Sequence, residues 1–179
     1  MNQKLPIPPL KAVRLQLEKG IDSFLHGEAK LFEALIGERA LTGTLALLYL
    51  RDMFAPWDVD PEYDRFGDVR KRSPIESRGE SKNLRGHLVT PDIIVHQKLH
   101  PTYNLLAIEA KSEDDPRGDV EDREKLASYL VKPLCYEYAA LLIFSATKEP
   151  ACGYELFQRG EDPKTPKQSI KRTASRYQA

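Results

Sequence analysis

Two acids and a lysine lie within runs of residues that are otherwise typical of buried β-strands. Asp92 comes directly before the apolar residues 93–95. Glu109 and Lys111 lie near the end of a second apolar run, which begins at Leu105. Burying an ionised group costs free energy unless the group is paired or binds a metal ion. Three such groups on neighbouring strands therefore indicate a functional site, and their chemistry suits metal-assisted cleavage of a phosphodiester.

The spacing of these residues predicts how they meet. Side chains alternate between the faces of a strand, so Glu109 and Lys111 share one face. The polar stretch 98–103 is typical of a hairpin loop. If the strands pair antiparallel with positions that sum to 201, Asp92 lies opposite Glu109 and Thr90 lies opposite Lys111. Opposed Cβ atoms are about 5 Å apart, which lets two carboxylates bind one Mg²⁺ or Mn²⁺ ion. A slip of one residue would separate the acids onto opposite faces.

The charges are balanced overall but unevenly distributed. Lys plus Arg and Asp plus Glu each number 27, so the net charge does not indicate nucleic-acid binding. Residues 65–85 hold seven bases and three acids, residues 164–179 hold five bases and no acid, and residues 109–124 hold eight acids and three bases. These segments are either solvated surface, or basic segments that contact a phosphate backbone near an acidic metal site. Under the second interpretation, we expect Arg70, Lys71 and Arg72 to contact nucleic acid.

Several classes of protein are disfavoured. The sequence has no Walker A loop, GxGxxG, HExxH or GxSxG motif, which disfavours common nucleotide-binding and hydrolase classes. Cys135 and Cys152 do not have the spacing of metal ligands, and no apolar signal precedes them. No run is long and apolar enough to cross a membrane. We therefore expect a cytoplasmic protein without membrane contacts.

Hydrophobic periodicity predicts an alternation of helices and strands. Helices are predicted at 10–25, 28–36, 38–54 and 120–136, and strands at 57–63, 88–97, 104–111, 138–146 and, as an edge strand, 154–158. Leu41, Leu45 and Leu48 form the apolar stripe of the third helix. Residues 64–87 are predicted to form a long loop. The whole chain, 1–179, reads as one domain with an N-terminal helical extension at 1–37 and a basic, poorly ordered tail at 164–179.

The order helix, strand hairpin, helix, strand, with Pro91-Asp92 and Glu109-Ala110-Lys111, resembles the PD-(D/E)xK nuclease superfamily over about residues 38–146. The resemblance implies an α/β restriction-endonuclease-like core, in which helices flank a mixed central sheet. More of the chain is similar to a bacterial branch of this superfamily, through Glu38–Thr42, Trp57–Tyr63, Pro91–His96, Asn104–Lys111, and Asp122 with Lys125-Leu126.

The resemblance also implies roles for single residues. Asp92 and Glu109 would bind the metal ion, and Lys111 would position or activate the attacking water and stabilise charge on the phosphate. Glu38 matches the acid that such nucleases carry on the first core helix, and Glu62 is a candidate for a further metal ligand. The implied activity is that of a metal-dependent nuclease, with DNA favoured over RNA as substrate. A homodimer would suit cleavage of both strands.

Each of these interpretations has an alternative. Glu38 could simply be an acid that the helix dipole favours at a helix start, and Glu62 could be a surface acid. His96 shares the face of Asp92, where a structural role is the ordinary one. Lys125 is read as a helix-surface residue paired with Asp122, with a contact to nucleic acid as the alternative.

The function has alternatives too. Glu109 and Lys111 could face solvent on an edge strand, since polar residues at alternate positions are typical of a half-exposed sheet. The chain could then be a non-catalytic module of the same fold that binds nucleic acid or a protein. A ribonuclease is the third hypothesis.

Overall fold

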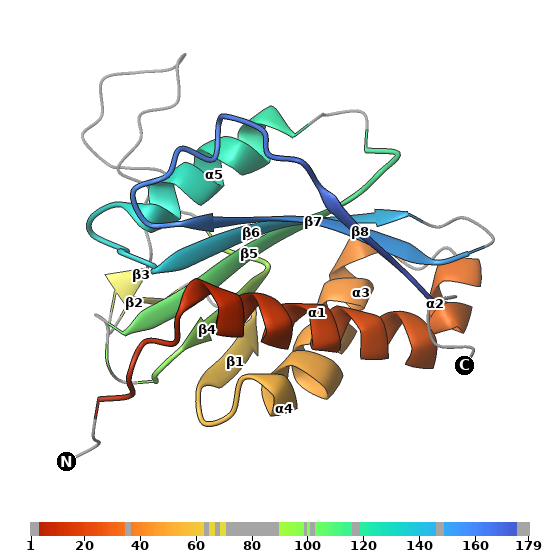
Figure 1. The fold of residues 1–179 in the computed structure, drawn as a ribbon, viewed down its shortest axis with the longest axis horizontal. Helices are drawn as coiled ribbons and strands as arrows, with labels where there is room; N and C mark the ends of the chain where they lie inside the picture. The colour runs from red at the N-terminus through yellow and green to blue at the C-terminus, as the bar shows by residue number, and fades with distance from the viewer. Residues whose placement is uncertain are drawn as a thin grey trace.

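The computed structural model describes residues 4–34, 37–62, 65–66, 69–70, 90–98, 100, 103–115, 119–145 and 149–174. A six-stranded sheet forms its centre, in the order β1-β4-β5-β6-β7-β8 (Figure 1). The strands are β1 (Asp58–Pro61), β4 (Ile93–His96), β5 (Asn104–Ser112), β6 (Tyr138–Ser145), β7 (Ala151–Gln158) and β8 (Ile170–Thr173). Strands β5 and β6 are parallel, and all other neighbours in this sheet are antiparallel. The predicted α/β class with a mixed, helix-flanked sheet is confirmed.

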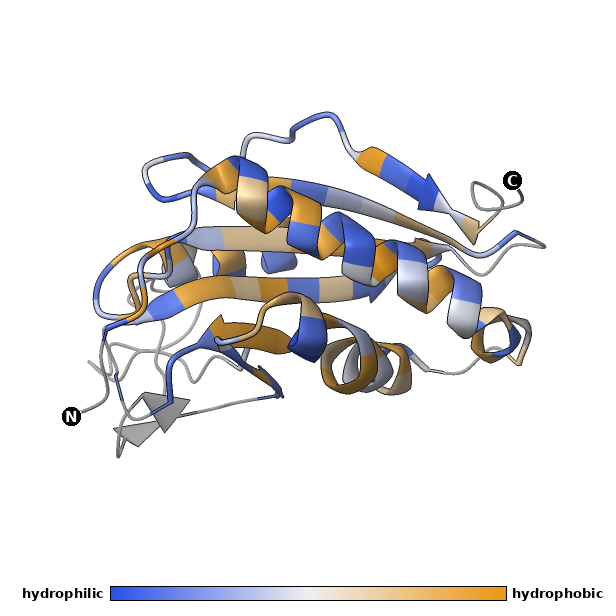
Figure 2. Cartoon of the chain, turned by 60° about the horizontal axis from the view of Figure 1, so that its bottom comes forward, coloured by the Kyte–Doolittle hydropathy of each residue, from blue (hydrophilic) through white to orange (hydrophobic). Residues whose placement is uncertain are grey.

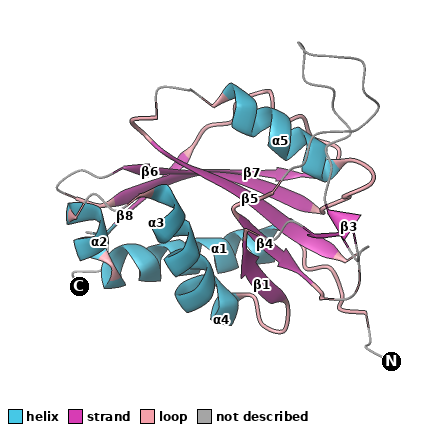
Figure 3. Ribbon diagram, turned by 180° about the vertical axis from the view of Figure 1, so that it is seen from behind, coloured by secondary structure: helices cyan, strands magenta, loops and turns pink. Residues whose placement is uncertain are grey.

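Helices cover both faces of the sheet. One face carries α1 (Leu10–Gly27), α2 (Ala29–Glu33), α3 (Glu38–Thr44), η1 (Leu45–Leu50) and α4 (Arg51–Met53), whereas α5 (Val120–Leu130) lies on the opposite face (Figure 3). The central strands are largely hydrophobic, whereas α1 carries both hydrophobic and hydrophilic residues (Figure 2). The buried side of α1 packs into the main core, through Val13, Leu17, Ile21, Phe24 and Leu25. The helix predicted as an N-terminal extension is thus part of the core.

The predicted helix 38–54 is present, but its apolar stripe shifts halfway along. Leu41 and Leu45 are buried as expected, whereas Leu48 is 63% exposed and Leu50 is buried instead. The cause is η1, a π-helical stretch, in which hydrogen bonds run from residue i to i+5 and each turn takes up more residues. Because the step from Leu45 to the next buried leucine is five residues, the prediction for Leu48 is wrong.

The predicted hairpin forms in the predicted register. Ile93 pairs with Ile108 and Val95 with Leu106, so the positions sum to 201, until a bulge near His96 shifts the register by one. Continued by one residue, this register places Asp92 opposite Glu109. Strand β4 begins only at Ile93, so the predicted pairing does not extend to Thr90.

The C-terminal half differs from the prediction in two ways. Helix α5 ends at Leu130 rather than at residue 136, since the backbone of Val131 is extended and Pro133 disfavours helical backbone at Lys132. Strand β7 is not an edge strand, since β8 pairs with its outer side. The tail predicted to be poorly ordered therefore contributes a strand, and Arg172 on β8 forms an ion pair with Asp22 of α1.

Part of the predicted loop 64–87 is described. Its backbone forms β2 (Arg65–Phe66) and β3 (Val69–Arg70), which pair antiparallel, and residues 71–87 lie outside the described part of the chain. Among the helices that the structure describes, none combines the length and apolar character that crossing a membrane requires.

Candidate metal and catalytic site

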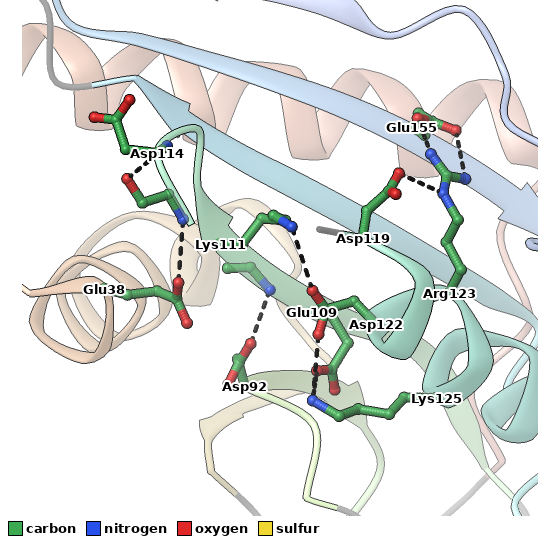
Figure 4. A network of polar contacts seen from close by, with 12 residues as sticks. Glu38, Asp92, Glu109, Lys111, Asp114, Asp119, Asp122, Arg123, Lys125 and Glu155 are labelled. Carbon is green, nitrogen blue, oxygen red and sulfur yellow. Dashed lines mark hydrogen bonds and ion pairs between the residues drawn. The ribbon is translucent and has the colours of Figure 1, made fainter. Parts of the chain in front are cut away.

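An acidic cavity lies between the end of β5, the start of α3 and the first turns of α5 (Figure 4). Its volume is about 230 Å³. Its lining includes six acids, which are Glu38, Asp92, Glu109, Asp115, Glu121 and Asp122. The other lining residues are the lysines Lys111 and Lys125 and the small apolar residue Ala110. The four residues predicted to be catalytic all lie in this lining. The hypothesis of a solvent-facing edge strand is wrong, because Glu109 and Lys111 are 2% and 6% exposed.

The cavity forms where β4 leaves the sheet. Pairing with β4 starts at Ile108, so the last residues of β5 have no β4 partner on that side. Two carboxylates take the place of a strand. Asp92 Oδ2 accepts a hydrogen bond from the Ala110 N–H at 2.8 Å, and Glu38 Oε2 accepts one from the Ser112 N–H at 3.1 Å. The backbone of β5 thereby holds two acids from other elements at the cavity.

Glu109 is the buried carboxylate of the cavity. Its Oε2 accepts a hydrogen bond from Lys125 Nζ at 3.0 Å, and its Oε1 accepts one from the Tyr129 hydroxyl at 2.6 Å. Burial, and then the nearby Asp92 carboxylate, raise the pKa of Glu109 to about 8, while Lys125 and Tyr129 oppose the increase. Burial also raises the pKa of Asp92, against the hydrogen bond from Ala110. The carboxylates of Asp92 and Glu109 therefore lie close enough to repel one another when both are ionised.

Lys111 projects from β5 on the same side as Glu109 (Figure 4). Its Nζ lies 3.9 Å from Oδ2 of Asp122, a residue of α5. The ammonium group of this buried lysine is thus held beside the Asp122 carboxylate, at a distance longer than a direct hydrogen bond. In this position it can add a positive charge and hydrogen-bond donors to whatever binds in the cavity.

The sequence did not reveal the full contribution of α5. Asp122, Lys125 and Tyr129 lie on one side of the helix, at spacings of three and four residues. The predicted pairing of Lys125 with Asp122 is confirmed at 3.3 Å, and 34% of the lysine side chain is exposed, but its Nζ also contacts the buried Glu109, which was not predicted. Tyr129 was missed altogether. The spacing of the three residues was a signal, but a buried tyrosine in an apolar helix face reads as ordinary core.

Glu62 lies beside this cavity and not in it. Its N–H donates to the Asp92 carbonyl at 2.9 Å, and its backbone has a φ of +47°. Its carboxylate forms an ion pair with Arg39. Both line a second cavity of about 540 Å³, whose other residues are Glu38, Thr90 and Asp92. The two cavities share the acids Glu38 and Asp92, so a metal-binding role of Glu62 stays a prediction.

Two further predictions concern residues away from this cavity. His96 is buried, and its Nε2 lies 2.8 Å from Oδ2 of Asp60 on the neighbouring strand, which supports the structural interpretation. The side chain of Arg70 and the whole of Lys71 and Arg72 lie outside the described residues. Their predicted contact with nucleic acid stays a prediction.

The donor set fits a hard divalent cation. All acids that line the cavity offer oxygen ligands, which Mg²⁺ and Mn²⁺ prefer, and they outnumber the lysines. Within the described ranges, no three His, Cys, Asp or Glu side chains already converge as a ready metal site. Mg²⁺ is commonly held by one or two carboxylates, with water and substrate phosphates as its other ligands. Asp92 and Glu109 are sufficient for such an arrangement.

No protein-family model and no curated protein matches the chain.

Proposed function

We propose that the protein is a Mg²⁺- or Mn²⁺-dependent nuclease with a restriction-endonuclease-like core. The observation that carries this proposal is the single cavity that Asp92, the buried Glu109 and Lys111 line together. Retaining two repelling carboxylates in a largely buried site is costly for a protein that has no use for them. A cation bound between them would relieve this repulsion.

The residues divide the work of hydrolysis. When bound, the divalent ion supplies a nucleophile near neutral pH and offsets charge on the phosphate. Asp92 and Glu109 would hold the ion. Lys111 donates hydrogen bonds to a phosphate oxygen as negative charge develops there, and Asp122 keeps its ammonium group in place. Glu38, which the Ser112 N–H orients, accepts a hydrogen bond from the attacking water.

The proposed substrate is a nucleic acid, and DNA is favoured over RNA through the resemblance in sequence. The excess of bases in residues 65–85 supports a polyanionic substrate. A cytoplasmic location and a homodimer that cleaves both strands complete the proposal.

The test is cleavage of labelled linear, branched and single-stranded DNA and of RNA by the purified protein, with Mg²⁺, Mn²⁺ or EDTA. We expect cleavage with either metal and none in EDTA. Asp92→Ala should lose nearly all of it while its circular dichroism stays that of the wild type. Asp52→Ala is the matched control, because Asp52 is an exposed acid of α4 outside the cavity. Undiminished cleavage in EDTA would disprove the proposal.

The same assay tests Lys111. Because Lys111 is proposed to act as charge develops on the phosphate, its loss should fall on the chemical step. We expect Lys111→Ala to bind substrate and metal but to lose most turnover. Lys111→Arg should restore little of it, since a planar guanidinium does not place its charge where a compact ammonium does.

A second candidate is a non-catalytic module that binds nucleic acid or a protein. The contact between Lys125 and Glu109 favours it, because the buried carboxylate then has a cationic partner within the chain. This candidate would be supported by a wild-type protein that binds nucleic acid without cleaving it, and whose binding is the same after Lys111→Ala.

A further inference from the structure

Lys125 joins two carboxylates that belong to different elements. Its Nζ lies 3.0 Å from Oε2 of Glu109 on β5 and 3.3 Å from Oδ1 of Asp122 on α5. The positive charge also acts on Asp92 and opposes the increase in the pKa of that acid. One ammonium group therefore compensates the negative charge of three cavity acids, which is what a bound cation would do.

The ammonium and a divalent cation compete for the same atoms. A cation between Asp92 and Glu109 requires carboxylate oxygens of Glu109, and Lys125 already donates a hydrogen bond to one of them. Two positive charges at the same oxygen would also repel one another. A cation that binds through Oε2 of Glu109 would therefore be opposed by Lys125 in its present position.

The side chain of Lys125 can turn away from the cavity while the carboxylate of Glu109 keeps its position. About a third of the lysine side chain is exposed, and its long stem can turn towards solvent without disturbing α5. Oε1 of Glu109 is held separately by the Tyr129 hydroxyl at 2.6 Å. The carboxylate therefore keeps its orientation after the ammonium has left.

From this geometry we propose that Lys125 is a built-in counter-cation of the acidic cavity, which a divalent ion must displace in order to bind. The inference rests on the proposed function and deepens it, because it assigns to Lys125 a positioning role in metal binding. The free protein then binds metal more weakly than its carboxylates alone would allow.

The test is a calorimetric titration of Mg²⁺ into wild type, Lys125→Met and Lys19→Met, without nucleic acid. The titration is run at about pH 9, above the pKa of Glu109. Lys19→Met is the matched control, since Lys19 is an exposed lysine of α1 and its loss changes the net charge equally. We expect Lys125→Met to bind Mg²⁺ about fivefold more tightly than wild type, the effect of removing one partly exposed ion pair. Mg²⁺ should also raise its melting temperature more than that of wild type.

The outcomes separate this inference from the proposed function. Metal binding by all three proteins with equal affinity, or weaker binding by Lys125→Met, would overturn the role of Lys125 and leave the metal site standing. A wild type that binds no Mg²⁺ in this titration would overturn both. If Lys125→Met does not fold, Lys125→Gln removes the same charge, and the same gain in affinity is expected of it.

Discussion

At the scale of single residues, Glu109 determines how the cavity responds to pH. Of the residues that line the cavity, Glu109 is the one fully buried acid, and its pKa is raised to about 8 from an ordinary value of 4.5. The folded protein therefore binds more protons than the unfolded chain between these two values. A raised pKa of an acid stabilises the fold at low pH, and this contribution is lost as the pH rises towards 8.

We accordingly expect the free energy of unfolding in EDTA to decrease between about pH 5 and pH 8, and to decrease much less in saturating Mg²⁺, which favours ionised carboxylates. Urea unfolding between about pH 5 and pH 8 measures this free energy. Glu109→Gln is the control, because it keeps the shape of the side chain and cannot titrate, so its stability should depend less on pH. A wild type whose pH dependence equals that of Glu109→Gln would contradict the assignment.

The residues that the sequence did reveal share one property. Asp92, Glu109 and Lys111 are charged residues within apolar strands, and this contrast is visible without a structure. Tyr129 is an aromatic residue within an apolar helix face, where nothing in the sequence sets it apart from core. Lys125 is a lysine among charged neighbours, and its contact with Glu109 depends on how α5 packs across β5.

At the scale of elements, α5 is held in place by a buried ion pair. Arg123 forms an ion pair with Glu155 of β7 at 2.6 Å, and both residues are 5% exposed. Arg123 also donates to Asp119 at 2.6 Å and to the Pro163 carbonyl at 2.9 Å. These contacts fix the start of the helix that carries Asp122 and Lys125 to the cavity (Figure 4).

Arg123→Met should destabilise the protein by about 3–5 kcal/mol, because it leaves the Glu155 carboxylate buried without its partner. The double variant Arg123→Met with Glu155→Gln should lose less stability than Arg123→Met, because it leaves no buried charge without a partner. Chemical unfolding measures the three proteins, with the exposed Arg51→Met of α4 as control. Equal stability of Arg123→Met and Arg51→Met would show that the pair contributes little.

The hairpin was predictable because its constraints are local. Alternation of side chains and a short loop fix the register of β4 and β5, and Ile93 pairs with Ile108 as expected. The shift from Leu48 to Leu50 in η1 was not predictable, because an i to i+5 turn depends on how the helix packs and not on its apolar pattern. Strand β8 was missed for a similar reason, since Ile170–Thr173 is polar and its strand conformation depends on pairing with β7.

At the scale of the whole molecule, two described residues on either side of the basic stretch lie at the same cavity. Glu62 and Thr90 both line the second cavity, and the chain between them includes the bases of residues 65–85. A polyanion that reaches Asp92 would therefore approach Glu62 and Thr90. The phosphate contacts of Arg70, Lys71 and Arg72 stay a prediction, which the following experiment tests.

Replacing Arg70, Lys71 and Arg72 together with Gln should weaken nucleic-acid binding and lower the dependence of log K on log salt by up to about three, because fewer counterions are released. Fluorescence anisotropy at several salt concentrations measures both. The control replaces Lys11, Lys19 and Lys30, which are exposed on α1 and α2, with Gln. If both triple variants lose affinity equally, the effect belongs to net charge and not to this segment.

The departure of β4 from the sheet has a consequence for self-association. An open strand edge offers its N–H groups to any extended peptide, including another copy of the same chain. On β5 these groups belong to Ala110 and Ser112, and Asp92 and Glu38 occupy them. The acids proposed to serve hydrolysis thus also block strand addition. A variant that lacks both carboxylates would expose an unpaired strand edge that another chain can bind. Its loss of activity could then result from aggregation, so the fraction that stays monomeric must be measured as well.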